Sequence, residues 1–130
     1  MKIEKGLLIK SPAVDNILSG RKTWEMRSAP TKIRGTIGLI RSKSGTVIGV
    51  VDIVDCKGPF SKGELLQNES KHLITPERLD SPEVSKYKFA WVMANARLFS
   101  RPVPYRHPAG AVIWVSLEPQ TSAAISGALS

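Results

Sequence analysis

Apolar residues along the chain fall in short runs separated by turn residues, a pattern that predicts several short strands. The first run, residues 6–9, has the length of a buried strand. Ser11 and Pro12 then suit the cap and the first position of a helix, and Gly20 supplies its stop. The segment between them therefore predicts a helix over about residues 12–19. Its apolar residues at helical spacing are Val14, Ile17 and Leu18.

A hairpin is predicted in the next part of the chain. Residues 22–27 are rich in strand formers and are closed by Pro30. Residues 34–41 and 46–54 are both strand-like, and the Ser-Lys-Ser-Gly segment 42–45 between them is typical of a turn. Glycines in this hairpin suit bends or close approach of the backbone. They are Gly35, Gly38 and Gly49.

The second half alternates between polar connections and apolar strands. Residues 59–86 are polar and predict one or two short helices on a connection. Strand character returns over residues 88–99 and again over 110–117, with a proline-rich, rigid loop between them. We expect one domain over residues 1–118, followed by a small-residue tail over residues 119–130 that is open to disorder.

Five or six short strands with two or three short helices in 130 residues predict an α+β fold, a small curved β-barrel with helices covering its ends. No G-x-x-x-x-G-K-[ST] sequence is present to indicate a phosphate loop. Cys56 is the single cysteine, which excludes an intramolecular disulfide and a cysteine-based zinc site. No apolar stretch has the length of a signal-peptide core or a bilayer span, so we expect a cytoplasmic protein without membrane contact.

The charge balance points to a polyanionic partner. Nineteen Lys and Arg residues stand against eleven Asp and Glu, a formal net charge of +8. Such an excess favours nucleic acid through phosphate contacts and counterion release. The alternative is a solubility charge spread evenly over the surface.

Residues 20–27, Gly-Arg-Lys-Thr-Trp-Glu-Met-Arg, fit the motif G-x-K-x-x-E-x-R directly after the predicted first helix. With this motif the chain resembles the ASCH family of PUA-like folds, in its short, stand-alone bacterial form. The resemblance extends over about residues 3–117 and includes the segments Lys5–Ile9, Gly49–Asp52, Ala90–Arg97 and Gly110–Val115. It implies a PUA-like barrel with a cleft beside the motif and a role in binding RNA or modified nucleosides.

The family resemblance also implies enzymatic alternatives. Some members have been assigned ribonuclease activity, and one bacterial branch resembles an amidohydrolase acting on acetylated cytidine. That branch uses the motif lysine, a threonine at the place of Glu25, and a later glutamate. Lys22 matches this set and Glu25 departs from it.

The candidate ligand-binding residues are two groups, the motif and a loop expected at the rim of the cleft. In a regular strand Lys22 and Glu25 would face opposite sides, so their convergence with Arg27 requires a loop or bulge at residues 23–24. The alternative is an ordinary structural salt bridge between Glu25 and Arg27. The complete set is Lys22, Trp24, Glu25, Arg27, Tyr105, Arg106 and His107.

The tryptophans and histidines give weaker indications of a binding site than the motif does. Trp24 is the best candidate for stacking on a base, Trp114 is assigned to the core, and Trp91 fits either place. His72 and His107 have no matching carboxylates or cysteines, so we expect surface or capping roles, no metal site and no cofactor.

Three functions follow as hypotheses. The first is a binding module for RNA, single-stranded nucleic acid or a modified nucleoside. The second is a metal-independent hydrolase on RNA or an acylated nucleoside, with Lys22 as base and Glu25 orienting it or the attacking water. The third and weakest is a protein-interaction adaptor.

Overall fold

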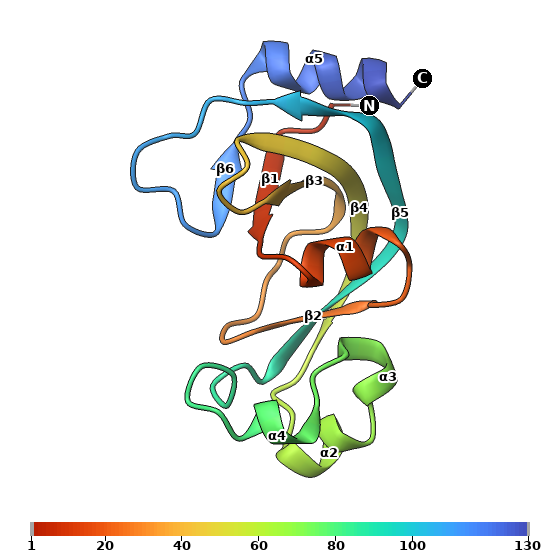
Figure 1. Ribbon diagram of the computed structural model, residues 1–130, viewed down its shortest axis with the longest axis vertical. Coiled ribbons are helices and arrows are strands. Elements are labelled where there is room, and N and C mark those ends of the chain that lie inside the picture. The colour runs from red at the N-terminus through yellow and green to blue at the C-terminus, as the bar shows by residue number, and fades with distance from the viewer. Residues whose placement is uncertain (1, 130) are drawn as a thin grey trace.

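The computed structural model describes residues 2–129, which form one curled sheet of six strands with five short helices (Figure 1). The strand order is β2-β5-β4-β3-β1-β6, with β1 and β3 parallel and the other neighbours antiparallel. The predicted α+β class and curved sheet are therefore confirmed. The strands are β1 (Lys5–Ile9), β2 (Trp24–Arg27), β3 (Gly35–Arg41), β4 (Thr46–Lys57), β5 (Phe89–Pro104) and β6 (Trp114–Ser116).

The two longest strands, β4 and β5, join the two parts of the molecule (Figure 1). At one end they curl around β1 and β3, and at the other they extend beside β2 toward a group of small helices. Their pairing shifts register at several points, and Asn95, with φ 57°, lies within one of these irregularities. Such bulges increase local twist, which allows strands of this length to curve.

The helices are α1 (Ala13–Leu18), α2 (Lys62–Leu66), α3 (Glu69–His72), α4 (Pro76–Leu79) and α5 (Pro119–Ala128). The connection after β4 thus holds three helices where the sequence predicted one or two. A capping box between Ser61 and Glu64 starts α2. Ser11 does not cap α1, because its hydroxyl donates to the Asp15 carboxylate instead.

Three segments near the C-terminus differ from the sequence prediction. β5 continues through Pro102, where a rigid loop was expected, because these residues keep pairing with β4. The last strand is confined to Trp114–Ser116. Residues 119–128 of the tail form α5, and Ile125 of this helix is fully buried among Ile3, Phe99 and other core residues.

The core rests on close packing of α1 against β4. Val14, Ile17 and Leu18 of α1 are buried against apolar side chains of β3, β4 and β5, as their spacing predicted. A Cβ atom at Gly49 would lie 2.5 Å from the carbonyl oxygen of Arg97 and 2.6 Å from Cδ2 of Leu18. This position therefore requires glycine, which confirms the predicted close approach.

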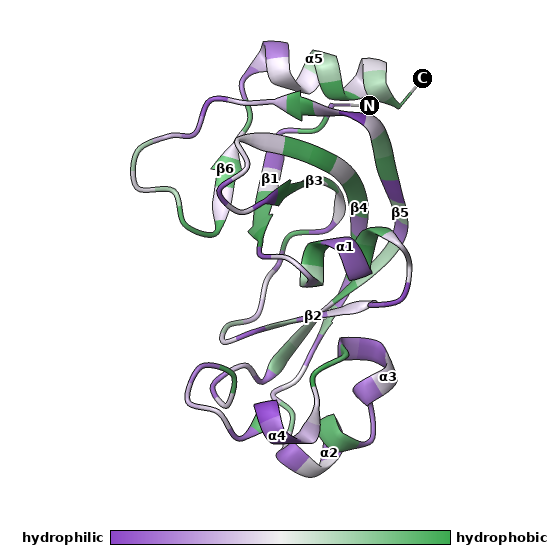
Figure 2. Cartoon of the chain, in the orientation of Figure 1, coloured by the Kyte–Doolittle hydropathy of each residue, from purple (hydrophilic) through white to green (hydrophobic). Residues whose placement is uncertain are grey.

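Hydrophilic residues make up all of α3 (Figure 2). Its last residue, His72, is nevertheless fully buried. Within residues 2–129, no helix is long and apolar enough to cross a membrane.

Candidate functional site

A cleft of about 580 Å³ lies where the end of β1 and the start of α1 meet β2 and the segment containing α3 and α4. Lys22, Glu25 and Arg27 of the motif all line it. The other walls come from segments far apart in sequence. They are residues 8–13, Asn16, Ser42, residues 72–74, Arg78, Val84, Lys86, Tyr87 and residues 112–113.

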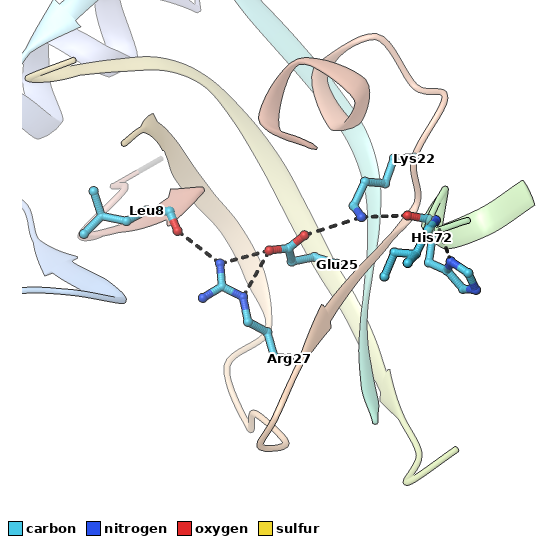
Figure 3. Close-up of polar contacts among 6 residues, drawn as sticks. Leu8, Lys22, Glu25, Arg27 and His72 are labelled. Atoms are coloured by element: carbon cyan, nitrogen blue, oxygen red, sulfur yellow. Dashed lines mark hydrogen bonds and ion pairs between the residues drawn. The ribbon is translucent and has the colours of Figure 1, made fainter. Parts of the chain in front are cut away.

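The three motif residues form a row of alternating charge along this cleft (Figure 3). Glu25 lies in the middle, with Oε1 3.7 Å from Lys22 Nζ and Oε2 2.9 Å from Arg27 Nη2. Arg27 also donates from Nε to the same Oε2 at 3.1 Å. Each cation is held at its outer side by a backbone carbonyl oxygen: Lys22 donates to His72 at 2.7 Å and Arg27 to Leu8 at 3.0 Å.

Lys22 reaches the row because it precedes β2 and is free of the strand's alternation. Its backbone N–H donates to the carbonyl of Asn16, and the Thr23 N–H donates to that of Lys71. The strand pairing with β5 begins at Trp24. The predicted departure from a regular strand at residues 23–24 is present, and it brings Lys22 to the same side as Glu25 and Arg27.

Burial governs the chemistry of Lys22, whose side chain is 7% exposed. Removal from water lowers the pKa of Lys22 below its usual value, because the charged form loses hydration. The Glu25 carboxylate opposes this shift, whereas Arg78 and Arg27 add to it. Lys22 therefore loses its proton at a lower pH than an exposed lysine does.

His72 is a structural part of this site. A surface or capping role was expected; the imidazole is buried and bonds to backbone groups, with Nε2 2.7 Å from the Leu65 carbonyl oxygen and Nδ1 accepting from the Ile74 N–H at 2.9 Å. These contacts require the neutral ring with its proton on Nε2. Burial lowers the pKa of His72, which favours this neutral form. The ring thereby fixes the backbone turn whose carbonyl holds Lys22.

Three exposed cations surround the row: Lys10 after β1, Arg78 in α4 and Lys86 before β5. An apolar wall faces them, formed by Val112 and Ile113, which are 78% and 43% exposed. Sequence analysis missed these five residues. Nothing in their local sequence distinguishes the cations from other surface lysines and arginines, since the fold alone brings them to one cleft.

Trp24 does not line the cleft, contrary to expectation. It is buried under α2 to α4, stacked on Phe60 at 5.0 Å between ring centroids, with Lys71 Nζ 5.0 Å from its ring. Strand alternation explains this, because Glu25 and Arg27 face the cleft and the residue before Glu25 faces away.

The expected rim loop also lies apart from the cleft-lining residues. Tyr105 packs against the core near α5, and its hydroxyl lies 2.8 Å from His107 Nδ1. His107 Nε2 lies 3.0 Å from the Ala111 carbonyl oxygen, so this histidine braces its own loop, and Arg106 is exposed. The loop contributes to the cleft only through its later residues 112–113.

Trp91 and Trp114 form a stacked pair beside Arg27. Their rings stack at 5.7 Å, and the Arg27 guanidinium carbon lies 5.4 Å from the Trp91 ring centroid. The Trp91 indole N–H donates to the Ala29 carbonyl at 2.9 Å. Both tryptophans thus help to orient Arg27. Residues 2–129 contain no group of three or more His, Cys, Asp or Glu side chains that could hold a metal ion.

Comparisons with known proteins agree with this architecture. The sequence model of the ASCH domain matches residues 7–103. The crystal structure of ASCH from Zymomonas mobilis superposes with a TM-score of 0.70 at 12% identity, covering 95% of this chain and 94% of that one. A mutant of that protein gives 0.69 at 14% identity, covering 97% and 96% of the two chains.

A more distant neighbour is the YTH domain of the Zygosaccharomyces rouxii MRB1 protein, solved in complex with N6-methyladenosine RNA. It gives a TM-score of 0.50 at 11% identity, covering 98% of this chain and 89% of that one. At such identities the likeness establishes the fold. Comparison with curated protein sequences gives no match.

Proposed function

The chain belongs to the ASCH domain family and has its PUA-like fold, and from this premise we propose that it binds RNA by holding one nucleoside in the cleft. The observation that carries the proposal is the row of buried Lys22 and Glu25 and half-buried Arg27 inside a cleft of about 580 Å³. Clefts of about 300 to 1,000 Å³ are typical of small-ligand sites, and a nucleoside fits this range.

The charges of the cleft favour phosphates at its exposed cations and disfavour them at the row of Lys22, Glu25 and Arg27. Five cationic side chains and one carboxylate line it. The carboxylate lies between Lys22 and Arg27, so a phosphate bound on the row would meet Glu25 at short range and be repelled. The exposed cations Lys10, Arg78 and Lys86 have no such neighbour in the cleft lining and suit the phosphates of a flanking strand.

This division supports a base at the row and a backbone at the entrance. Phosphate contacts position a nucleic acid, and contacts to base edges specify it. A single strand can place one unstacked base in such a pocket without the cost of opening a duplex. The YTH neighbour, which has the same general fold, was solved with N6-methyladenosine RNA, and that is consistent with a nucleoside in this chain's cleft.

Binding of a short labelled single-stranded RNA to matched variants tests the proposal. Arg27→Met and Lys86→Met should each weaken binding by about tenfold through loss of a charge-assisted contact. Lys57→Met, an exposed residue of β4 outside the cleft lining, should weaken it much less. Equal losses in all three variants would assign the affinity to the overall charge of +8 and remove the cleft from the function.

A second candidate function is a metal-independent hydrolase, favoured by one observation. The lowered pKa of Lys22 makes its neutral, basic form easier to reach than that of a surface lysine. In this scheme Lys22 accepts a proton from the attacking water while Glu25 orients the lysine. Turnover of RNA or of an acylated nucleoside should then persist in chelator and disappear in Lys22→Met. Loss of turnover in chelator, restored by a divalent ion, would contradict it.

A further inference from the structure

The hydrogen-bonding groups left free along the Lys22, Glu25 and Arg27 row define which base fits there. Lys22 has three N–H groups, of which one donates to the His72 carbonyl oxygen and a second faces the Glu25 ion pair. The hydrogen bonds of Arg27 within residues 2–129 use Nε and Nη2, leaving both N–H groups of Nη1. Each end of the row therefore retains a donor.

The middle of the row retains an acceptor. Both contacts from Arg27 fall on Glu25 Oε2. Oε1 lies 3.7 Å from Lys22 Nζ, close enough for an ion pair and too far for a hydrogen bond. A carboxylate oxygen accepts hydrogen bonds and does not donate them. Lys22 Nζ and Glu25 Oε1 thus place a donor beside an acceptor, whereas Arg27 Nη1 lies on the side of the guanidinium turned away from Glu25 (Figure 3).

Resting on the proposed function, we infer that this donor and acceptor select a base that presents a carbonyl beside a ring N–H, as uracil does, over cytosine and adenine. The ring N–H donates to Glu25 Oε1, and the adjacent carbonyl oxygen accepts from Lys22. The backbone carbonyls of His72 and Leu8 hold the two cations in place before the base arrives, so little ordering is needed on binding.

Cytosine and adenine mismatch at identifiable points. Cytosine places a ring nitrogen lone pair against Glu25 Oε1 and an amino group against Lys22. Adenine likewise offers a ring acceptor to the carboxylate. Guanine presents the same carbonyl beside a ring N–H as uracil and fits equally. Because Lys22 and Glu25 are buried, each mismatch leaves a hydrogen-bonding group of the base unsatisfied in the cleft.

The test compares short RNA strands of equal length that differ only in the base: all uridine, all cytidine, and uridine methylated at N3. Equal phosphate charge makes counterion release equal, so affinity differences report the base. Wild-type protein should bind the uridine strand at least about tenfold more tightly than either of the others. Equal binding of all three would overturn the inference while leaving the proposed function standing, whereas failure of every strand to bind would overturn both.

Glu25→Gln supplies a test from the protein side. Its amide can turn either an oxygen or an NH₂ group to the ligand, so the preference for uridine over cytidine should shrink to about twofold or less. Asp80→Asn removes an exposed carboxylate, paired with Lys62 outside the cleft, and should keep the full preference. A full preference in Glu25→Gln would also overturn the inference. Should this variant fail to fold, the methylated strand decides with wild-type protein.

Discussion

Removing the single negative charge of the row by Glu25→Gln should destabilise the folded protein far more than an ordinary ion-pair mutation. The side chains of Lys22 and Glu25 are 7% and 10% exposed, and that of Arg27 is 18% exposed. Loss of one partner from a buried pair leaves an uncompensated charge and costs about 3 to 5 kcal/mol. Arg27 retains some water and the Leu8 carbonyl, so we expect the lower end, about 3 kcal/mol.

The pH dependence of this cost follows from Lys22. The folded-state pKa of Lys22 already lies below its unfolded value, and without Glu25 it falls further, because the carboxylate is the main influence that raises it. Between the two pKa values the unfolded chain binds more protons than the folded one, so stability increases as pH rises. The deficit of Glu25→Gln relative to wild type should therefore shrink from about pH 7 toward about pH 9.5.

Urea denaturation at both pH values measures these effects, with Asp80→Asn as the control. Asp80 pairs with Lys62 in an ion pair whose side chains are 63% and 54% exposed, so its loss should cost less than about 1 kcal/mol at either pH. If Glu25→Gln costs no more than Asp80→Asn, or if its deficit grows with pH, the row is not the desolvated ionic cluster described above.

Three further outcomes are expected. Gly49→Ala should lower the free energy of unfolding by at least about 2 kcal/mol, because the added Cβ meets the Arg97 carbonyl oxygen and Leu18, and a melting temperature like that of wild type would contradict this packing. Trp24→Ala should cost about 3 to 5 kcal/mol in denaturant titrations yet leave the uridine-to-cytidine ratio of the folded fraction unchanged, and a changed ratio would return Trp24 to the ligand site. In salt titrations Lys10→Ala should reduce the log–log slope of RNA binding by about 0.7, and an unchanged slope would remove Lys10 from the phosphate contacts.

β2 shows most clearly how much of the site could be predicted from the sequence. The motif and its break from strand alternation could be predicted, because the spacing of Lys22, Glu25 and Arg27 demands an irregular backbone if all three are to meet. The same alternation sends Trp24 to the opposite face, which the sequence analysis overlooked by treating the motif as one surface. Periodicity rules applied residue by residue would have placed it correctly.

Other parts of the site depend on contacts between distant segments. His72 lies in a hydrophilic helix, and its burial follows from the Leu65 carbonyl and the Ile74 N–H, which no local pattern reveals. Likewise, α5 has little amphipathic character, and Ile125 is fixed by a core that the rest of the fold creates. Tertiary packing supplies what local propensity leaves open in both cases.

Mapping the RNA-binding surface by backbone amide chemical shifts tests the central claim most directly. On titration with a short single-stranded uridine RNA, the largest shifts should fall on the amides of Lys22 and of residues 25–28, 72–74 and 112–113, which border the cleft. Amides of α5 and of the turn at residues 42–45 should move little, Ser42 excepted because it touches the cleft. Large shifts on those distant elements, or small shifts spread over every lysine-bearing surface, would contradict binding in the cleft.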